Sequence, residues 1–111
     1  RKLAQDLHVE MICVIGSGLP HPIALVQLSE GASLQPREEI RTSLKNTLEA
    51  VNPHLESHET VDAIVVVSEK WDVDNDVLTP TLKIKRHVLE QSFSEKVDGI
   101  RGGKICWEDE I

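Results

Sequence analysis

The sequence predicts an α+β fold, in which helices pack on a small central β-sheet. The predicted elements follow one another in the order helix, strand, strand, helix, strand, helix. The run from 62 to 67 is rich in valine and isoleucine and too short for a buried helix, so we expect a central strand covered on both faces. A chain of 111 residues can bury one modest core. We therefore expect residues 1–111 to form a single domain.

The first third of the chain is expected to hold a short helix and two strands. Residues 1–7 have helical polarity, with two leucines four positions apart, and they begin without a cap or a methionine. We therefore expect the native protein to continue upstream of this point. The apolar runs 9–15 and 23–28 predict two buried strands. Glycines and prolines between 16 and 22 predict that a long hairpin loop joins them.

The clearest predicted helix covers residues 36–51. Pro36 stands at its first turn, where a missing N–H costs nothing, and Glu38 and Glu39 favour the helix dipole there. Asn52 and Pro53 end it. One stripe of this helix is apolar and should face the sheet; its members are Ile40, Leu44, Leu48 and Val51.

The last third of the chain is expected to begin with a polar loop, 70–76, around Trp71. From about Ile84 the apolar residues return to helical spacing, and this pattern fades at Gly99. The positions that carry it are Ile84, Val88, Phe93 and Val97, with Leu89 at the edge of the stripe. The tail 104–108 fits either a late edge strand or a docking strand, and the sequence does not decide between them.

Charge and composition exclude several classes of function. The chain has 12 Lys plus Arg against 19 Asp plus Glu, and the net charge of -7 argues against non-specific nucleic-acid binding, which needs a basic field. It holds no run of about 18 apolar residues and no signal-peptide pattern, so we expect no transmembrane segment and a cytoplasmic protein. Cys13 and Cys106 lack Cys-x-x-Cys spacing, which favours two buried thiols that act as small hydrophobes.

Three weaker motifs are interpreted as structural. Gly16-Ser-Gly18 follows a strand but leads to Leu-Pro-His-Pro rather than a helix, so it is expected to be a turn. The acids of 72–76 have calcium-loop spacing, but valine replaces the required glycine at the sixth position. His54 and His58 have zinc-ligand spacing on a helix but lack a third ligand, which favours a solvated connection. No metal site is therefore expected.

The segment 78–86, Leu-Thr-Pro-Thr-Leu-Lys-Ile-Lys-Arg, gathers three cations at a predicted helix start in an acidic chain. Cations in a first turn oppose the helix dipole, which suggests that an anion is expected there. On a helix, Lys83 would share a face with His87, and Lys85 would lie about 200° around from Lys83. Lys85 and Arg86 are therefore interpreted as a solvated helix face, and Lys83 is the leading functional candidate.

This segment resembles the C-terminal lysine motif of the AMP-forming acyl-CoA synthetases, in the adenylate-forming superfamily, and has the form typical of the long-chain fatty acid ligases. The resemblance covers most of the chain. Further matching landmarks are 11–16, 22–26, Val51-Asn52, 63–67 and 71–81. Asp76 stands where the family usually has glycine, and the family's more common Ser-Gly-Lys is here Thr81-Leu82-Lys83.

The resemblance implies the C-terminal lid domain of a larger ligase that turns a fatty acid, ATP and CoA into acyl-CoA, AMP and pyrophosphate. Lys83 would be its catalytic adenylation lysine, and Lys83 and Thr81 would contact the nucleotide. ATP, CoA and magnesium would bind together with an N-terminal adenylation domain of the same chain, and the hinge and CoA-site residues would lie upstream of Arg1. The isolated domain is then expected to be inactive, and the acyl chain length is set elsewhere.

The alternative hypothesis is a free-standing α+β interaction module that uses this basic corner to bind an acidic ligand or partner. A domain taken from a larger enzyme should leave an exposed apolar patch and an uncapped first helix, whereas a free module should bury both.

Overall fold

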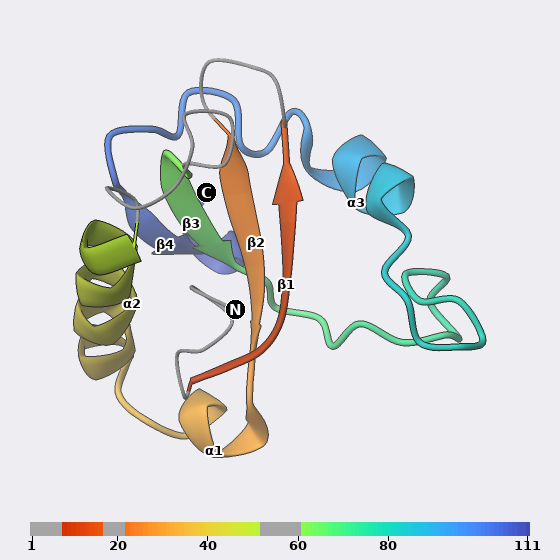
Figure 1. Cartoon of the computed structure of the whole chain (residues 1–111), viewed down its shortest axis with the longest axis horizontal. Coiled ribbons are helices and arrows are strands. Elements are labelled where there is room, and N and C mark those ends of the chain that lie inside the picture. The colour runs from red at the N-terminus through yellow and green to blue at the C-terminus, as the bar shows by residue number, and fades with distance from the viewer. Residues whose placement is uncertain (1–7, 17–21, 52–60) are drawn as a thin grey trace.

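The computed structural model describes residues 8–16, 22–51 and 61–111 (Figure 1). The predicted helix at 1–7, the remainder of the loop that starts at Gly16, and the His54 and His58 segment lie outside this part of the chain. Gly16 itself has a φ of 73°, a left-handed conformation that suits a turn.

One four-stranded sheet organises the domain. Its strands are β1 (Val9–Ile15), β2 (Ile23–Leu28), β3 (Ala63–Val66) and β4 (Ile105–Trp107), and they lie side by side in that order. β1 pairs antiparallel with β2, as the predicted hairpin requires, whereas β2, β3 and β4 run parallel to one another. The tail of the chain is thus an edge strand on β3. The predicted α+β class, a small mixed sheet with helices, is confirmed.

The helices differ from the sequence prediction in several places. The structure has α1 (Glu30–Ser33), α2 (Arg37–Val51), α3 (Arg86–Phe93) and the 3-10 turn η4 (Glu108–Glu110). α2 matches the predicted helix closely. α1 was not predicted, because its single turn is set by a cap: the Ser29 side chain accepts a hydrogen bond from the Ala32 N–H.

The predicted start of the last helix is wrong. α3 begins at Arg86, so Lys83 lies outside it and does not share a helical face with His87. The reason is pairing along the chain: Ile84 forms a β-bridge with Leu78, and that extended conformation excludes a helix at Ile84. The helix also ends at Phe93 and continues as turns towards Gly99.

Both faces of the sheet are covered, as predicted from its valine-rich central strand. Figure 1 shows α2 beside β4 and α3 beyond β1. Alternate residues of β3 belong to separate cores: Ile64 and Val66 pack with α2, while Ala63 and Val65 pack in the cluster that contains α3. The α2 residues that fill the first core are Ile40, Leu44 and Leu48, and each contributes about 1.5–3 kcal/mol by leaving water.

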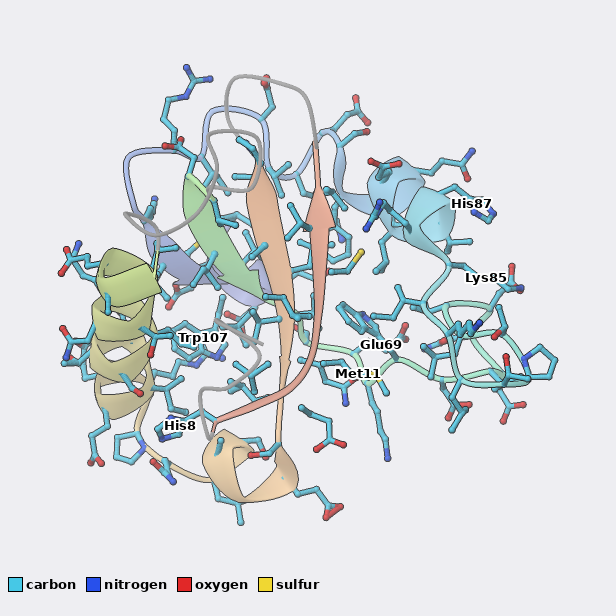
Figure 2. All side chains as sticks on the ribbon, viewed as in Figure 1. His8, Met11, Glu69, Lys85, His87 and Trp107 are labelled. Carbon is cyan, nitrogen blue, oxygen red and sulfur yellow. The ribbon has the colours of Figure 1, made fainter. Side chains whose placement is uncertain are left out.

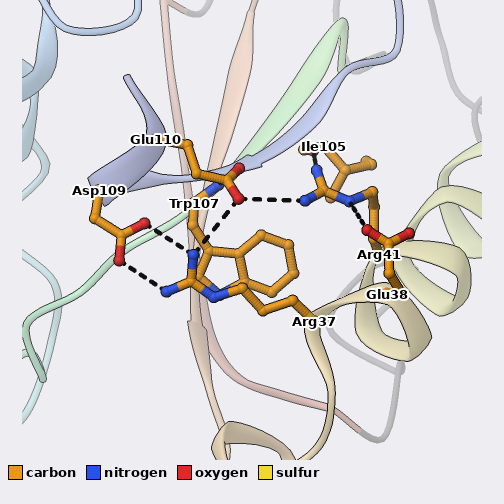
Figure 3. Close-up of polar contacts among 7 residues, drawn as sticks. All are labelled: Arg37, Glu38, Arg41, Ile105, Trp107, Asp109 and Glu110. Carbon is orange, nitrogen blue, oxygen red and sulfur yellow. Dashed lines mark hydrogen bonds and ion pairs between the residues drawn. The ribbon is translucent and has the colours of Figure 1, made fainter.

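The C-terminal end is tied to α2 around Trp107 (Figure 3). The guanidinium groups of Arg37 and Arg41 each lie 5.1 Å from the centre of the indole ring. Arg37 also binds both carboxylate oxygens of Asp109, at 2.9 and 2.7 Å. The Glu110 side chain accepts a hydrogen bond from the main-chain N–H of Trp107 at 3.0 Å and lies 3.3 Å from the Arg41 guanidinium. β4 and η4 are therefore held against the helix by aromatic, polar and ionic contacts together.

In the described part of the chain, no helix has the length and apolar character that a membrane crossing requires.

Candidate functional site

Residues 77–85 form a small hairpin, called here the lysine hairpin. Its arms are joined by the antiparallel bridge between Leu78 and Ile84. The Lys85 N–H donates to the Val77 carbonyl at 2.7 Å, and the Thr79 N–H donates to the Lys83 carbonyl at 2.8 Å. The segment that the sequence predicted to open a helix therefore projects as a loop of its own, seen at the right of Figure 1.

The tip of the hairpin is a three-residue loop, 80–82. The Leu82 N–H donates to the Thr79 carbonyl at 2.7 Å, which closes a β-turn with Pro80 at its second position. Leu82 then has a φ of 64°. A turn followed by one left-handed residue is a common three-residue hairpin loop, and the left-handed position favours glycine. This explains why the resemblance places glycine at this position.

The base of the hairpin is buried, whereas its tip is in solvent. Val77 and Leu78 are 6% and 3% exposed and belong to the same core cluster as Leu89 of α3. Leu82, by contrast, is 62% exposed. The preceding segment is anchored at Trp71. The main-chain N–H of Trp71 donates a hydrogen bond to the buried Gln27 side chain of β2 at 2.7 Å. A rigid base thus carries an accessible tip.

The tip presents both predicted site residues. Lys83 and Thr81 are exposed, and the Thr81 hydroxyl lies 3.1 Å from the Thr79 hydroxyl. The main chain of Lys83 is fixed, because its N–H donates to the Thr79 hydroxyl at 3.0 Å. Its ammonium makes no hydrogen bond or ion pair with any residue that the structure describes. The structure thus leaves this charge available to an incoming anion.

The sequence predicts Lys85 on a solvated helix face, and the structure shows that this prediction is wrong. It occupies the cap position of α3, where a lysine offers no acceptor to the helix N–H groups. Its ammonium instead lies 2.6 Å from Oδ1 of Asp76. Figure 2 shows Lys85 where the hairpin meets α3, next to His87 of the helix. Lys85, and to a lesser degree His87, lower the pKa of the Asp76 carboxyl.

Asp76 is the functional candidate that sequence reasoning undervalued. Its φ is 67°, so the chain keeps here the left-handed conformation that a glycine would adopt easily. The tight turn that the resemblance leads one to expect is therefore present despite the aspartate. The sequence did carry a signal for Asp76. An acidic residue stands at a position expected to hold glycine, and it lies close to the Lys-Ile-Lys-Arg run.

The cysteines and the acidic loop, which are the other candidates in the described part of the chain, are structural. Cys13 and Cys106 are free and buried, as predicted, and burial raises the pKa of both thiols. Among the described residues, no three His, Cys, Asp or Glu side chains gather where they could hold a metal ion. In the acidic loop, Asn75 is used structurally, since its amide donates to Glu69 and to the Lys70 carbonyl.

The domain thus combines a mixed sheet that has helices on both faces with an exposed lysine on a hairpin whose base is buried. The sequence model of a protein family, the AMP-binding enzyme C-terminal domain, matches residues 1–102 of this chain. The chain belongs to that family.

Two solved structures of the adenylate-forming superfamily share this fold. One is the adenylation and carrier didomain of a carboxylic acid reductase from Segniliparus rugosus in complex with AMP, with 19% identity over 87% of this chain and a TM-score of 0.70. The other is the adenylation domain of a carboxylate reductase from Mycobacterium chelonae, with 19% identity over 89% of this chain and a TM-score of 0.73. The matched regions are 14% and 16% of those two chains. No curated protein matches this chain.

Proposed function

We propose that this chain is the mobile C-terminal domain of an ATP-dependent, AMP-forming acyl-CoA ligase, and that residues 1–111 act as its lid. Lys83 supplies the catalytic ammonium of the adenylation step, and Thr81 contacts the nucleotide beside it. The observation that carries this proposal is the position of Lys83: its main chain is held by Thr79, its hairpin has a buried base, and its ammonium is available.

The chemistry of adenylation explains why a lysine is needed. A fatty carboxylate oxygen attacks the α-phosphorus of ATP, an acyl-phosphate bond forms, and pyrophosphate leaves. Two anions must approach each other while charge spreads over the phosphoryl oxygens. An ammonium on a flexible stem offers three donors and a compact charge that offset this repulsion. By the family resemblance, magnesium, ATP and the fatty acid are proposed to bind together with the N-terminal adenylation domain.

In the second half-reaction, the thiol of CoA attacks the acyl carbon and AMP leaves. We propose that this domain rotates between the two steps, so that Lys83 leaves the site before the thiol enters. The parent enzyme is proposed to work in the cytoplasm.

Two observations support activation of a carboxylate as its adenylate. The two structural neighbours are named for carboxylic acid substrates, and one of them was solved with AMP. The choice of CoA ligase over reductase depends on the resemblance of residues 78–86 to the long-chain ligase motif. Product analysis tests this choice: acyl-CoA supports the ligase, whereas aldehyde formed with a reduced nicotinamide cofactor would contradict it.

The role of Lys83 is tested by Lys83→Ala in the full-length parent protein. Pyrophosphate release should fall by about 100- to 1000-fold, the usual loss when one preorganised donor is removed. Thioester formation from supplied acyl-adenylate should persist. Lys45→Ala, on the exposed face of α2, is the matched control and should leave both steps unchanged. Equal losses in the two steps would contradict the assignment.

The size of the native protein distinguishes the proposed ligase from the alternative, a free-standing interaction module. An antibody against this chain should detect a native protein several times longer than 111 residues if the domain is part of a ligase. A band at the chain's own size would favour the module, with the lysine hairpin as its binding surface for an acidic partner.

A further inference from the structure

Lys83, Lys85 and Arg86 stand within four consecutive residues, and among the described residues Lys85 alone of the three forms an ion pair. Lys85 is bound to Asp76 at 2.6 Å. Arg86 lines a groove of about 460 Å³ together with Ile84 and residues 12–14 of β1. Lys83 has no ionic partner in the part of the chain that the structure describes. Within the lysine hairpin, residues 77–85, Lys85 is therefore paired with a carboxylate and Lys83 is not, as far as the described residues show.

The hairpin geometry explains why the charge of Lys85 has to be kept from the anion that Lys83 binds. In an extended arm, residues two apart lie on the same face, so Lys83 and Lys85 belong to one face. At a rise of about 3.3 Å per residue, their main-chain positions are about 7 Å apart, which is within the reach of two lysine side chains. An unpaired Lys85 could therefore bind the phosphate oxygens that Lys83 must meet.

Asp76 has the position and the charge to prevent this competition. Its carboxylate is 73% exposed, whereas the Lys85 side chain is 29% exposed, so the pair lies at the rim of the hairpin base. The Lys85 N–H also binds the carbonyl of Val77, next to Asp76, which keeps the two side chains in register. The aspartate is held in a left-handed conformation that costs most residues free energy, although aspartate tolerates it better than bulkier residues do.

We propose that Asp76 is a positioning residue for adenylation: it binds Lys85 and so leaves Lys83 as the cation of the lysine hairpin that meets the reacting anions. This inference depends on the proposed function. It concerns a residue that does not touch the substrate but acts through Lys85.

The test uses Asp76→Asn, Lys85→Met and the double variant in the full-length parent, with pyrophosphate release as the readout. Asparagine tolerates the left-handed conformation, and methionine keeps an unbranched apolar stem. Asp76→Asn frees Lys85, and Lys85→Met frees Asp76 to bind Lys83, so each single variant should lower kcat by about fivefold. The double variant has neither competing charge and should recover to within about twofold of wild type.

Recovery distinguishes positioning from simple stabilisation. If the ion pair only held the hairpin together, the double variant would also lack it and would be no faster than the single variants; that result would overturn the proposal. The KM for ATP gives a second readout. A freed Lys85 adds attraction in the ground state, so the KM of Asp76→Asn should not rise, whereas a disordered hairpin would raise it.

Asp76→Gly keeps the proposal testable if the asparagine variant folds poorly. Glycine relieves the left-handed backbone while it removes the carboxylate, so this variant should fold well and still lose about fivefold in kcat. Wild-type activity in a folded Asp76→Gly variant would overturn the proposal. If Lys83→Ala keeps full activity, the proposed function fails instead; if Lys83→Ala collapses and the double variant does not recover, only the role of Asp76 fails.

Discussion

Thr79 and Lys83 bind each other twice across the lysine hairpin. The Thr79 N–H donates to the Lys83 carbonyl at 2.8 Å, and the Thr79 hydroxyl accepts from the Lys83 N–H at 3.0 Å. Threonine therefore satisfies both main-chain polar groups of the lysine from one position. A lysine side chain is long and flexible, whereas the main chain that carries this one is held by two hydrogen bonds.

Thr79→Val should loosen that point without removing the lysine. The Lys83 N–H would lose its acceptor, which costs about 0.5–1.5 kcal/mol for a typical hydrogen bond. We expect faster hydrogen exchange at the Lys83 amide and a fall in adenylation kcat of about two- to tenfold. Thr79→Ser keeps the hydroxyl and serves as the control. If valine and serine variants exchange at the same rate, the hydroxyl does not hold the hairpin.

The sequence predicts the elements that local patterns define. The stripe of α2, with Pro36 at its start and Asn52-Pro53 after it, sets that helix to within a residue. The valine-rich run of β3 predicts a strand covered on both faces. Such patterns report which side chains leave water, and burial is the dominant favourable term in folding.

The elements that the sequence does not predict depend on contacts across the chain. Ile84 and Val88 have helical spacing, yet Ile84 pairs with Leu78 and delays α3 to Arg86. At the start of β1, the register shifts between Val9 and Met11, and this bulge moves Val9 to the α2 core. The Lys85–Asp76 pair joins residues nine positions apart, and spacing along a single element cannot reveal it.

Leu82→Gly should stabilise the chain, because Leu82 has a φ of 64° and a 62% exposed side chain. A left-handed conformation costs a non-glycine residue about 1–2 kcal/mol, part of which is offset by the greater freedom of glycine in the unfolded chain. The net gain should be about 0.5–1 kcal/mol, or about 3–6 °C in Tm. Leu82→Ala removes the side chain but keeps the strained backbone. An alanine variant as stable as the glycine variant would contradict this explanation.

Asp109 should make the chain sensitive to acid. Its hydrogen bonds with Arg37 hold the pKa of the Asp109 carboxyl below its ordinary value in the folded state. The stabilisation is therefore complete above the unfolded-state pKa and is lost as pH falls through the lower folded-state pKa. Urea midpoints should show that Asp109→Asn is less stable than wild type at pH 7 and that the difference narrows below about pH 4. Glu95→Gln, at an exposed carboxylate, is the control, and a constant gap across the pH range would contradict the role of the pair.

Gln27 connects the sheet to the loop that leads into the lysine hairpin. Its side-chain oxygen accepts the Trp71 N–H at 2.7 Å, and the glutamine is only 8% exposed. Gln27→Met fills a similar volume but leaves that buried N–H without an acceptor, at a cost of about 1–3 kcal/mol. Urea unfolding should show this loss, and adenylation by the parent protein should fall because the hairpin base shifts.

Gln27→Glu separates the hydrogen bond from the shape of the side chain. Glutamate keeps an oxygen acceptor at the same reach, so the Trp71 N–H stays satisfied, although burial of a carboxylate carries its own penalty. That penalty should diminish at low pH as the carboxyl protonates, whereas the loss in Gln27→Met should not depend on pH. If Gln27→Met loses adenylation activity but not stability, the glutamine acts on the hairpin by a route other than the Trp71 contact.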